Sequence, residues 1–137
     1  APVIEKTAES LIKSNEENDI NSLLENIAKN RLKYFKKVFP VMKIILFEGQ
    51  IDNTFRQKVF QEITHLIVKR LEKLFEKKIL QGELKEIDAN NLAKTFMSFV
   101  IGMSILNEVS KGSFFEPEGA EAFIPNAIEV FTNGIKK

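Results

Sequence analysis

The chain has 137 residues, which is the usual size of a single domain and is long enough to bury a hydrophobic core. Hydrophobic residues make up 44% of the sequence and charged residues 28%, a composition that excludes a disordered tail. With 20 basic and 19 acidic residues the net charge is +1, so the chain as a whole has no field that would attract nucleic acid or an anionic membrane. The absence of cysteine excludes disulfides, thiolate catalysis and cysteine metal sites.

Two amphipathic helices are predicted at the start of the chain. Residues 3–14 carry apolar side chains at helical spacing, and Asp19 is a suitable N-cap for a second helix over residues 20–39. Arg31 falls on the apolar side of that second helix. Two interpretations of Arg31 stay open: its stem lies along the apolar surface with its head in water, or its head is a cationic anchor for a ligand carboxylate.

Pro40 is predicted to end or kink the second helix, because proline lacks the N–H group and disfavours helical geometry at Phe39. The apolar run over residues 41–47 could be a buried strand or a short buried helix by its periodicity alone. No other segment is predicted as a strand that could pair with it, and a lone strand would leave its backbone groups unpaired. We therefore expect a separate short helix over residues 41–47.

The longest helical pattern covers residues 52–81 and is expected to form a central helix with several neighbours. Its apolar positions cover a broad arc, and Gly82 suits the C′ position after its end. Arg56 and Arg70 point into that arc, where each could pair internally or coordinate a ligand. His65 is the only histidine and lies on the polar side, so we expect it to be exposed.

A helix capped by Asp88 and ending near Val109 is predicted to be apolar on two sides. Leu92, Phe96, Phe99, Val100 and Met103 form one apolar side, Met97, Ile101 and Ile105 form the other, and Thr95, Ser98 and Gly102 form a stripe of small side chains between them. Its most apolar part, Phe96–Leu106, reaches only about 16 Å, too short for a bilayer core of about 30 Å. We therefore expect a buried helix that needs two partners, and in so small a chain a second subunit could supply one.

The chain is predicted to end with a loop over residues 110–118 and a last amphipathic helix from Phe123 to Ile135. Phe114 and Phe115 would form an apolar plug in the loop, and Pro125 would bend the first turns of the helix. With no repeats and no internal linker, residues 1–137 are predicted to form one all-α domain of about six helices.

No constellation in the sequence supports catalysis. A single histidine excludes metal sites built on a histidine pair, and no glycine-rich phosphate loop follows a strand. Glu62 and His65 occur once at the Glu-x-x-His spacing of bundle metal sites, but on the polar side of the helix and without a second copy. We therefore predict that the chain is not an enzyme and that it needs no metal and no cofactor.

The segment Leu80–Lys85, followed by Asp88–Ala93 and by Phe96, Phe99, Gly102 and Met103, resembles the TetR-like transcriptional repressors. In that family a long helix ends in a similar glycine-containing turn, and an Asp-capped apolar helix follows. The order of elements over nearly the whole chain fits as well. The resemblance implies a C-terminal domain that binds a small hydrophobic effector among its middle helices and forms a homodimer through its last two long helices.

The resemblance also implies what lies outside these residues. The helix-turn-helix domain that binds the operator in this family is absent from the chain, which begins Ala1-Pro2 instead of with methionine, so we expect an upstream domain. The chain would then be cytoplasmic, would not associate with membranes, and would contact DNA only through that domain. The alternative from another functional class is a helical lipid carrier, or an adaptor for a partner helix, with no DNA role.

Two sets of candidate site residues follow. For each pocket residue the alternative is plain core, and for the small stripe it is packing inside one monomer. The candidate ligand-binding residues are Arg31, Phe35, Phe39, Met42, Phe47, Phe60, Arg70, Phe96, Phe99 and Met103. The candidate residues of a dimeric four-helix interface are Thr95, Ser98, Ile101, Gly102, Ile105, Phe123, Ala127, Val130 and Phe131.

Overall fold

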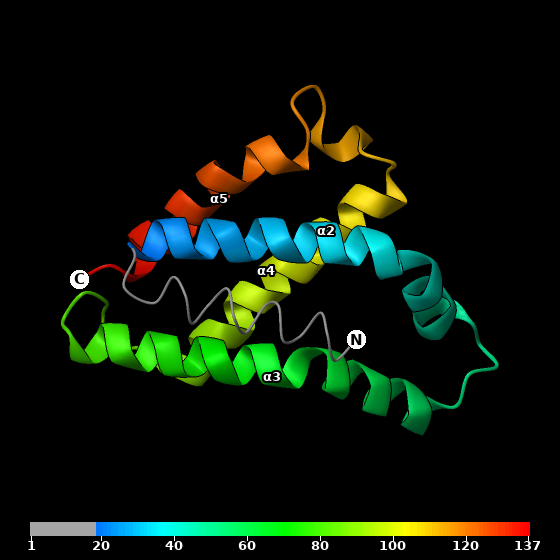
Figure 1. Cartoon of the computed structure of the whole chain (residues 1–137), viewed down its shortest axis with the longest axis horizontal. Helices are drawn as coiled ribbons and strands as arrows, with labels where there is room; N and C mark the ends of the chain where they lie inside the picture. Colours follow the sequence, from blue (N-terminus) through cyan, green and yellow to red (C-terminus); the bar gives the residue numbers. More distant parts are fainter. Residues whose placement is uncertain (1–18) are drawn as a thin grey trace.

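The computed structural model describes residues 19–137, with the side chain at position 63 left out, so the helix predicted over residues 3–14 lies outside the described residues. The predicted all-α fold is confirmed: the described part contains helices and no strand, with one isolated bridge between Leu84 and Lys136. The elements, drawn in Figure 1, are α2 (Ile20–Phe47), α3 (Asn53–Leu80), α4 (Ala89–Val109), the 3₁₀ helix η1 (Ser113–Phe115) and α5 (Ala120–Ile135).

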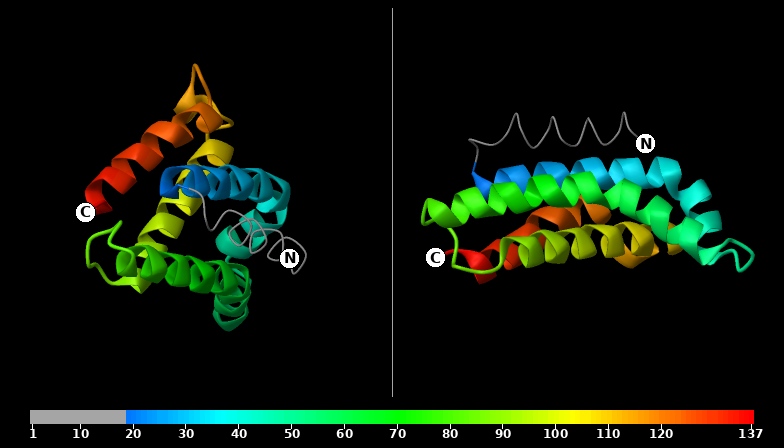
Figure 2. Two further views of the ribbon diagram at one scale, coloured as in Figure 1. Left: turned by 60° about the vertical axis from the view of Figure 1, so that its left-hand side comes forward. Right: turned by 90° about the horizontal axis from the view of Figure 1, so that it is seen from below.

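The helices lie in two layers, with α2 and α3 in one and α4 and α5 in the other (Figure 2). α4 packs on α2, α3, η1 and α5, and α2 also packs along α5. α4 is therefore the described element with the most neighbours, and α3, expected to be central from its pattern, packs chiefly on α4. The core between the layers includes the fully buried side chains of Leu23, Leu24, Ile27, Leu71, Phe75, Phe96, Ile124 and Ile128.

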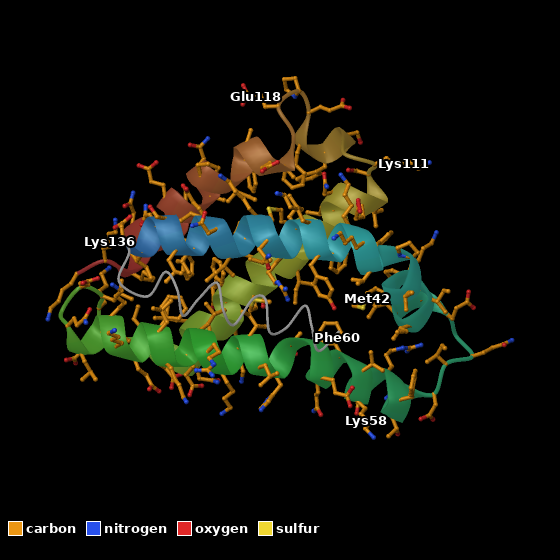
Figure 3. The ribbon with its side chains drawn as sticks, viewed as in Figure 1. Met42, Lys58, Phe60, Lys111, Glu118 and Lys136 are labelled. Atoms are coloured by element: carbon orange, nitrogen blue, oxygen red, sulfur yellow. The ribbon has the colours of Figure 1, made fainter. Side chains whose placement is uncertain are left out.

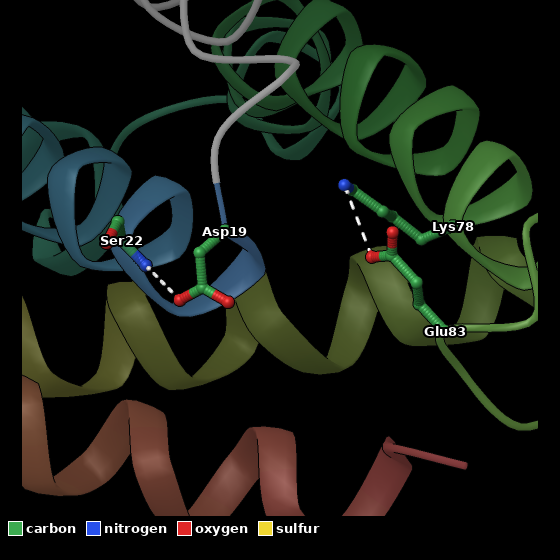
Figure 4. A network of polar contacts seen from close by, with 4 residues as sticks. All are labelled: Asp19, Ser22, Lys78 and Glu83. Carbon is green, nitrogen blue, oxygen red and sulfur yellow. Dashed lines mark hydrogen bonds and ion pairs between the residues drawn. The ribbon is translucent and has the colours of Figure 1, made fainter.

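Aspartate caps fix where the three long helices begin. The carboxylates of Asp19, Asp52 and Asp88 each accept a hydrogen bond from the backbone N–H three residues later, at 3.4, 3.1 and 2.9 Å respectively. Figure 4 shows the first of these caps, with the bond from the Ser22 amide. Such a cap stabilises a helix by about 1 kcal/mol, because it pairs an amide that has no partner within the helix. The caps predicted at Asp19 and Asp88 are confirmed.

The turn after α3 has the geometry expected for Gly82. This residue has φ of +79°, which glycine adopts without steric cost, and the amides of Gly82 and Glu83 donate to the carbonyls of Ile79 and Lys78. An ion pair of 3.3 Å between Lys78 Nζ and the Glu83 carboxylate crosses the same turn (Figure 4). Two further backbone bonds, Lys85 N–H to the Ile135 carbonyl and Lys137 N–H to the Glu83 carbonyl, join this turn to the end of α5.

The separate short helix predicted over residues 41–47 is wrong, because α2 continues through Pro40 to Phe47. Figure 1 shows that the last turns of α2 bend away from its first part, so Pro40 bends the helix without ending it. Packing offsets the lost hydrogen bond, because Met42 is buried beyond the proline and holds the segment against the rest of the domain.

The length argument against a membrane span also needs correction. α4 covers 21 residues, about 31 Å, and is the one helix in the described range that is long and apolar enough to cross a membrane. Its inner sides are buried against the rest of the domain, and the core helix of a soluble protein passes the same test. One such helix is therefore weak evidence for a membrane span.

Candidate functional site

A small cavity lies between α2, α3 and α4. Its volume is about 40 Å³, and almost its entire wall is apolar. Met42 on α2 and Phe60 on α3, both labelled in Figure 3, belong to this wall. The full lining is Arg31, Tyr34, Phe35, Val38, Met42 and Leu46 from α2, Phe60 and Thr64 from α3, and Met97, Val100, Ile101, Ser104 and Ile105 from α4.

Arg31 is the only charged side chain among the described residues that line the cavity. It is 5% exposed, so the interpretation with its head in water is wrong. Its Nε and Nη2 donate to Asn30 Oδ1 at 3.3 and 3.2 Å, and its guanidinium carbon lies 4.6 Å from the centre of the Tyr34 ring. The amide and the ring therefore hold the planar guanidinium in one orientation at the cavity wall.

Two other polar groups of the wall, the hydroxyls of Thr64 and Ser104, already donate to their own helices. Thr64 Oγ1 donates to the Phe60 carbonyl at 2.9 Å, and Ser104 Oγ donates to the Val100 carbonyl at 2.7 Å. Each hydroxyl oxygen still has a lone pair that can accept a hydrogen bond. The described wall thus combines one cation, a few weak acceptors and a large apolar surface.

Four of the predicted pocket residues line the cavity: Arg31, Phe35, Met42 and Phe60. Phe39 and Phe47 lie instead on a shallow surface groove formed by the last turns of α2. The remaining four candidates, Arg70, Phe96, Phe99 and Met103, line neither.

Arg70 is exposed, because the buried arc of α3 is narrower than the sequence pattern suggests and leaves Leu66 and Arg70 outside it. The prediction that Arg70 points into the apolar arc is therefore wrong.

Phe96, Phe99 and Met103 lie on the side of α4 that faces the core and α5. Phe96 and Met103 are buried, and the partly exposed Phe99 ring lies between the rings of Phe96 and Phe123, at 6.2 and 6.4 Å. The cavity is bounded by the other apolar side of α4, which carries Met97, Ile101 and Ile105, and also by Val100, which the sequence pattern had grouped with Phe96 and Met103. The pattern had shown both sides of this helix but not which of them faces the cavity.

Sequence reasoning missed nine lining residues. Tyr34, Val38 and Leu46 share the face of α2 that carries Arg31, so the helical spacing from Arg31 was a signal that could have found them. Thr64 and Ser104 carried no signal for a cavity, because serine and threonine are mostly found on protein surfaces. The missed residues are Tyr34, Val38, Leu46, Thr64, Met97, Val100, Ile101, Ser104 and Ile105.

The cavity is small, and part of its wall lies on the segment after Pro40. Sites for small molecules usually measure about 300–1,000 Å³, so 40 Å³ holds only a few atoms. Met42 and Leu46 form the wall on this segment, where the helix has already lost one backbone hydrogen bond. Met42 and Met97 are unbranched and adapt to new shapes more easily than leucine or phenylalanine.

Arg56 fastens the end of that segment to α3. Its Nε donates to the Ile45 carbonyl and its Nη2 to the Glu48 carbonyl, both at 2.8 Å. These carbonyls lie at the C-terminal end of α2, where a cation is also favoured by the helix dipole. Of the two roles considered for Arg56, the geometry supports internal pairing.

On the layer away from α2 and α3, the helices α4 and α5 expose small and apolar side chains. We call this surface the outer face; it consists of Thr95, Ser98, Gly102, Leu106 and Val109 on α4 and Phe123, Ala127, Val130 and Gly134 on α5. Val130 is 77% exposed, and a Cβ added at Gly102 or Gly134 would meet no atom within 4 Å. A second surface could therefore approach the backbone closely along both helices.

The predicted interface residues do not all lie on one surface. Thr95, Ser98, Gly102, Phe123, Ala127 and Val130 lie on the outer face, whereas Ile101 and Ile105 line the cavity. Phe131 is half-buried beneath the outer face, where its ring packs on Phe96 at 5.7 Å and on Phe75 at 6.4 Å.

The described residues contain no group of three or more histidine, cysteine, aspartate or glutamate side chains that could hold a metal ion. His65 is exposed, as predicted. No protein-family model matches the chain, and none of the curated proteins matches it. The functional argument therefore depends on the geometry around α4.

Proposed function

We propose that this chain is the effector-binding and dimerisation domain of a cytoplasmic, TetR-like transcriptional regulator. A small hydrophobic effector binds in the cavity, and two copies of the chain associate through their outer faces. DNA is contacted only by a separate helix-turn-helix domain. The order of helices, with a glycine-containing turn before an Asp-capped apolar helix, supports the family resemblance.

The observation that carries this proposal is the position of α4 between two different surfaces. One side of α4 borders the cavity, and another side belongs to the outer face. A monomer gains nothing from leaving phenylalanine, valine and leucine side chains exposed along two adjacent helices. Pairing two such helices with their copies forms a four-helix interface with twofold symmetry, which buries them.

Sedimentation equilibrium on the unaltered chain tests the dimer. The expected result is a dimer at tens of micromolar, and a monomer at that concentration refutes this half of the proposal. Mass spectrometry of the purified chain under native conditions tests the other half, because a co-purified apolar molecule adds its mass to the protein. The sequence upstream of Ala1 decides the DNA role: without a helix-turn-helix pattern there, the proposal of a carrier or adaptor takes its place.

A further inference from the structure

We infer that the exposed side of α2 binds an amphipathic helix of another protein, and that the polar residues of this partner helix are acidic. We call this side of α2 the lysine face; its members, all exposed, are Lys33, Lys36, Lys37, Pro40, Val41, Lys43, Ile44, Phe47 and the C-cap residue Glu48. The lysine face shares no residue with the cavity wall or with the outer face, so the inference needs neither the proposed effector nor the proposed dimer.

The lysine face is one continuous side of the helix. At about 100° per residue, its positions fall within about 160° of the helix circumference. From position 33 to position 48 it extends about 22 Å, at a rise of about 1.5 Å per residue. Phe35 and Met42 are buried on the opposite side, against the rest of the domain. Figure 1 shows that the last turns of α2 lie at the end of the domain opposite the C-terminus.

The charge of the lysine face is not neutralised within the described part of the chain. Between positions 33 and 58 the sequence has six basic and two acidic residues, whereas the whole chain has 20 and 19. The four lysines of the face make no ion pair with a carboxylate of residues 19–137. A partner that carries carboxylates is therefore attracted by four exposed ammonium groups and opposed by the single carboxylate of Glu48.

Apolar side chains follow the lysines along the same face. Val41, Ile44 and Phe47 are 60%, 53% and 63% exposed in the single chain. Ile44 and Phe47 also line the shallow groove at the end of α2, together with Phe39 and Pro40. An apolar side chain of a partner can fill this groove. Burial of the apolar residues would then supply affinity, and the lysines beside them would select an acidic partner.

A helix is the partner structure that fits this face. Extended segments usually bind by adding to the edge of a sheet, and residues 19–137 contain no strand. An amphipathic helix that lies along a groove presents apolar anchors at positions i, i+3, i+4 and i+7. Val41, Ile44 and Phe47 follow one another at intervals of three residues, so the anchors of a partner helix can contact them in turn.

A second copy of the chain and a membrane surface match the lysine face less well. Two lysine faces related by a twofold axis would place lysines against lysines. A bilayer surface is flat and leaves the groove unfilled, and an anionic bilayer repels Glu48 at the rim of that groove. An acidic helix has neither difficulty, because its anchors enter the groove and its carboxylates can be arranged beside the lysines.

Fluorescence anisotropy with a labelled peptide tests the inference on the unaltered chain. The probe is a helical peptide of about 18 residues, with leucine at the anchor positions and glutamate on its other side. One control has the same composition in an order that gives no apolar side, and the other has lysine in place of glutamate. The chain is expected to bind the probe at least about tenfold more tightly than either control at low salt.

Each contrary result of this titration overturns a stated part of the inference. Equal affinity for the glutamate and lysine peptides overturns the acidic character of the partner. Equal affinity for the probe and the reordered peptide overturns the recognition of a helix. No binding of the probe overturns the whole inference.

Two substitutions of the same kind locate the bound peptide. Ile44→Glu places a carboxylate in the groove and is expected to weaken probe binding about tenfold or more. Val130→Glu places one on the outer face and is the matched control, expected to change the affinity by less than about twofold. Both side chains are more than half exposed, so each variant should keep the fold. Equal losses in the two variants show that the peptide binds elsewhere and overturn the inference.

Vesicle binding and sedimentation test the other two occupants. The unaltered chain is expected to stay in solution when vesicles of phosphatidylserine and phosphatidylcholine are sedimented, and Ile44→Glu is expected to self-associate like the unaltered chain. Vesicle binding that Ile44→Glu abolishes assigns the lysine face to a membrane surface and overturns the inference. A change of self-association in Ile44→Glu assigns it to a second copy, with the same consequence. A monomeric chain, or one without a co-purified apolar molecule, contradicts the proposed function and leaves the peptide result standing.

Discussion

If two chains pair through their outer faces as proposed, one charged residue in that face should separate the dimer. Val130 is 77% exposed in the single chain and lies between Ala127 and Gly134 along the outer face of α5. Val130→Glu should leave the fold of each chain unchanged, because its side chain points into solvent there. In the dimer the same change places a carboxylate in an apolar contact, so dimerisation should weaken.

The size of this effect follows from the exposed area. Burying a whole valine side chain gains about 1.5 kcal/mol, so burying the exposed part of Val130 gains about 1 kcal/mol in each chain. A twofold interface contains two copies, and the loss of about 2 kcal/mol corresponds to about a thirtyfold rise in the dissociation constant of the dimer. Desolvation of two carboxylates adds about 2 kcal/mol or more, which brings the expected rise to about a thousandfold.

Sedimentation equilibrium over a range of concentrations measures that constant. Val41→Glu is the matched control, because Val41 is also helical and 60% exposed but lies on the last turns of α2, outside the outer face. The control should dimerise like the unaltered chain. If both variants keep the dimer equally well, the chains associate through some other surface and the reasoning about the outer face is wrong.

Three other substitutions test the fold and the parts of the site. Arg56→Ala removes two hydrogen bonds to the end of α2 and should lower the free energy of unfolding by about 1–2 kcal/mol. Amide hydrogen exchange should become faster only over residues 41–48, which would show that the loss is local to this segment. Phe96→Ala should lower the free energy of unfolding, measured in urea, by about 3–5 kcal/mol, because the Phe96 side chain is 0% exposed. Phe114→Ala is the control and should lower it by less than about 0.5 kcal/mol, because Phe114 is 60% exposed. Equal losses in the two variants would contradict the position of Phe96 in the core. Gly102→Ala should stabilise the single chain by about 0.5–1 kcal/mol and weaken the dimer, and a variant that dimerises more tightly would show that no close approach occurs at Gly102.

Local signals explain why the fold could be predicted. The side chains of Asp19 and Asp88 cap helices in any surroundings, and Gly82 adopts its positive φ because of its own lack of a Cβ. The continuation of α2 past Pro40 could not be predicted in this way. It depends on the burial of Met42 and on the bonds from Arg56, which lies on the next helix and reaches these carbonyls only when α2 and α3 have come together.

The candidate site could be predicted only in part, because periodicity gives the faces of a helix but not its neighbours. The pattern of α4 correctly separated Met97, Ile101 and Ile105 from Phe96 and Met103. It could not show that the first three border the cavity, since that depends on where α2 and α3 cross α4. The burial of the Arg31 head was likewise set by tertiary packing, against the usual preference of a long cationic side chain for water.

Under the proposed function, α4 is the element that connects the effector to the dimer. A ligand larger than 40 Å³ must displace part of the cavity wall, and that wall includes both the segment after Pro40 and α4. The segment after Pro40 is fastened by two hydrogen bonds, whereas α4 is packed along its length against α2 and α3.

If the segment yields first, the ligand is accommodated and the outer face keeps its position. If α4 moves as well, Thr95, Ser98 and Gly102 move with it, and the angle between the two copies changes. An Arg56→Ala variant, in which the segment yields more easily, should therefore bind the proposed hydrophobic effector more tightly while transmitting less of the binding energy to the proposed dimer, because only a difference in ligand affinity between two arrangements can shift one toward the other.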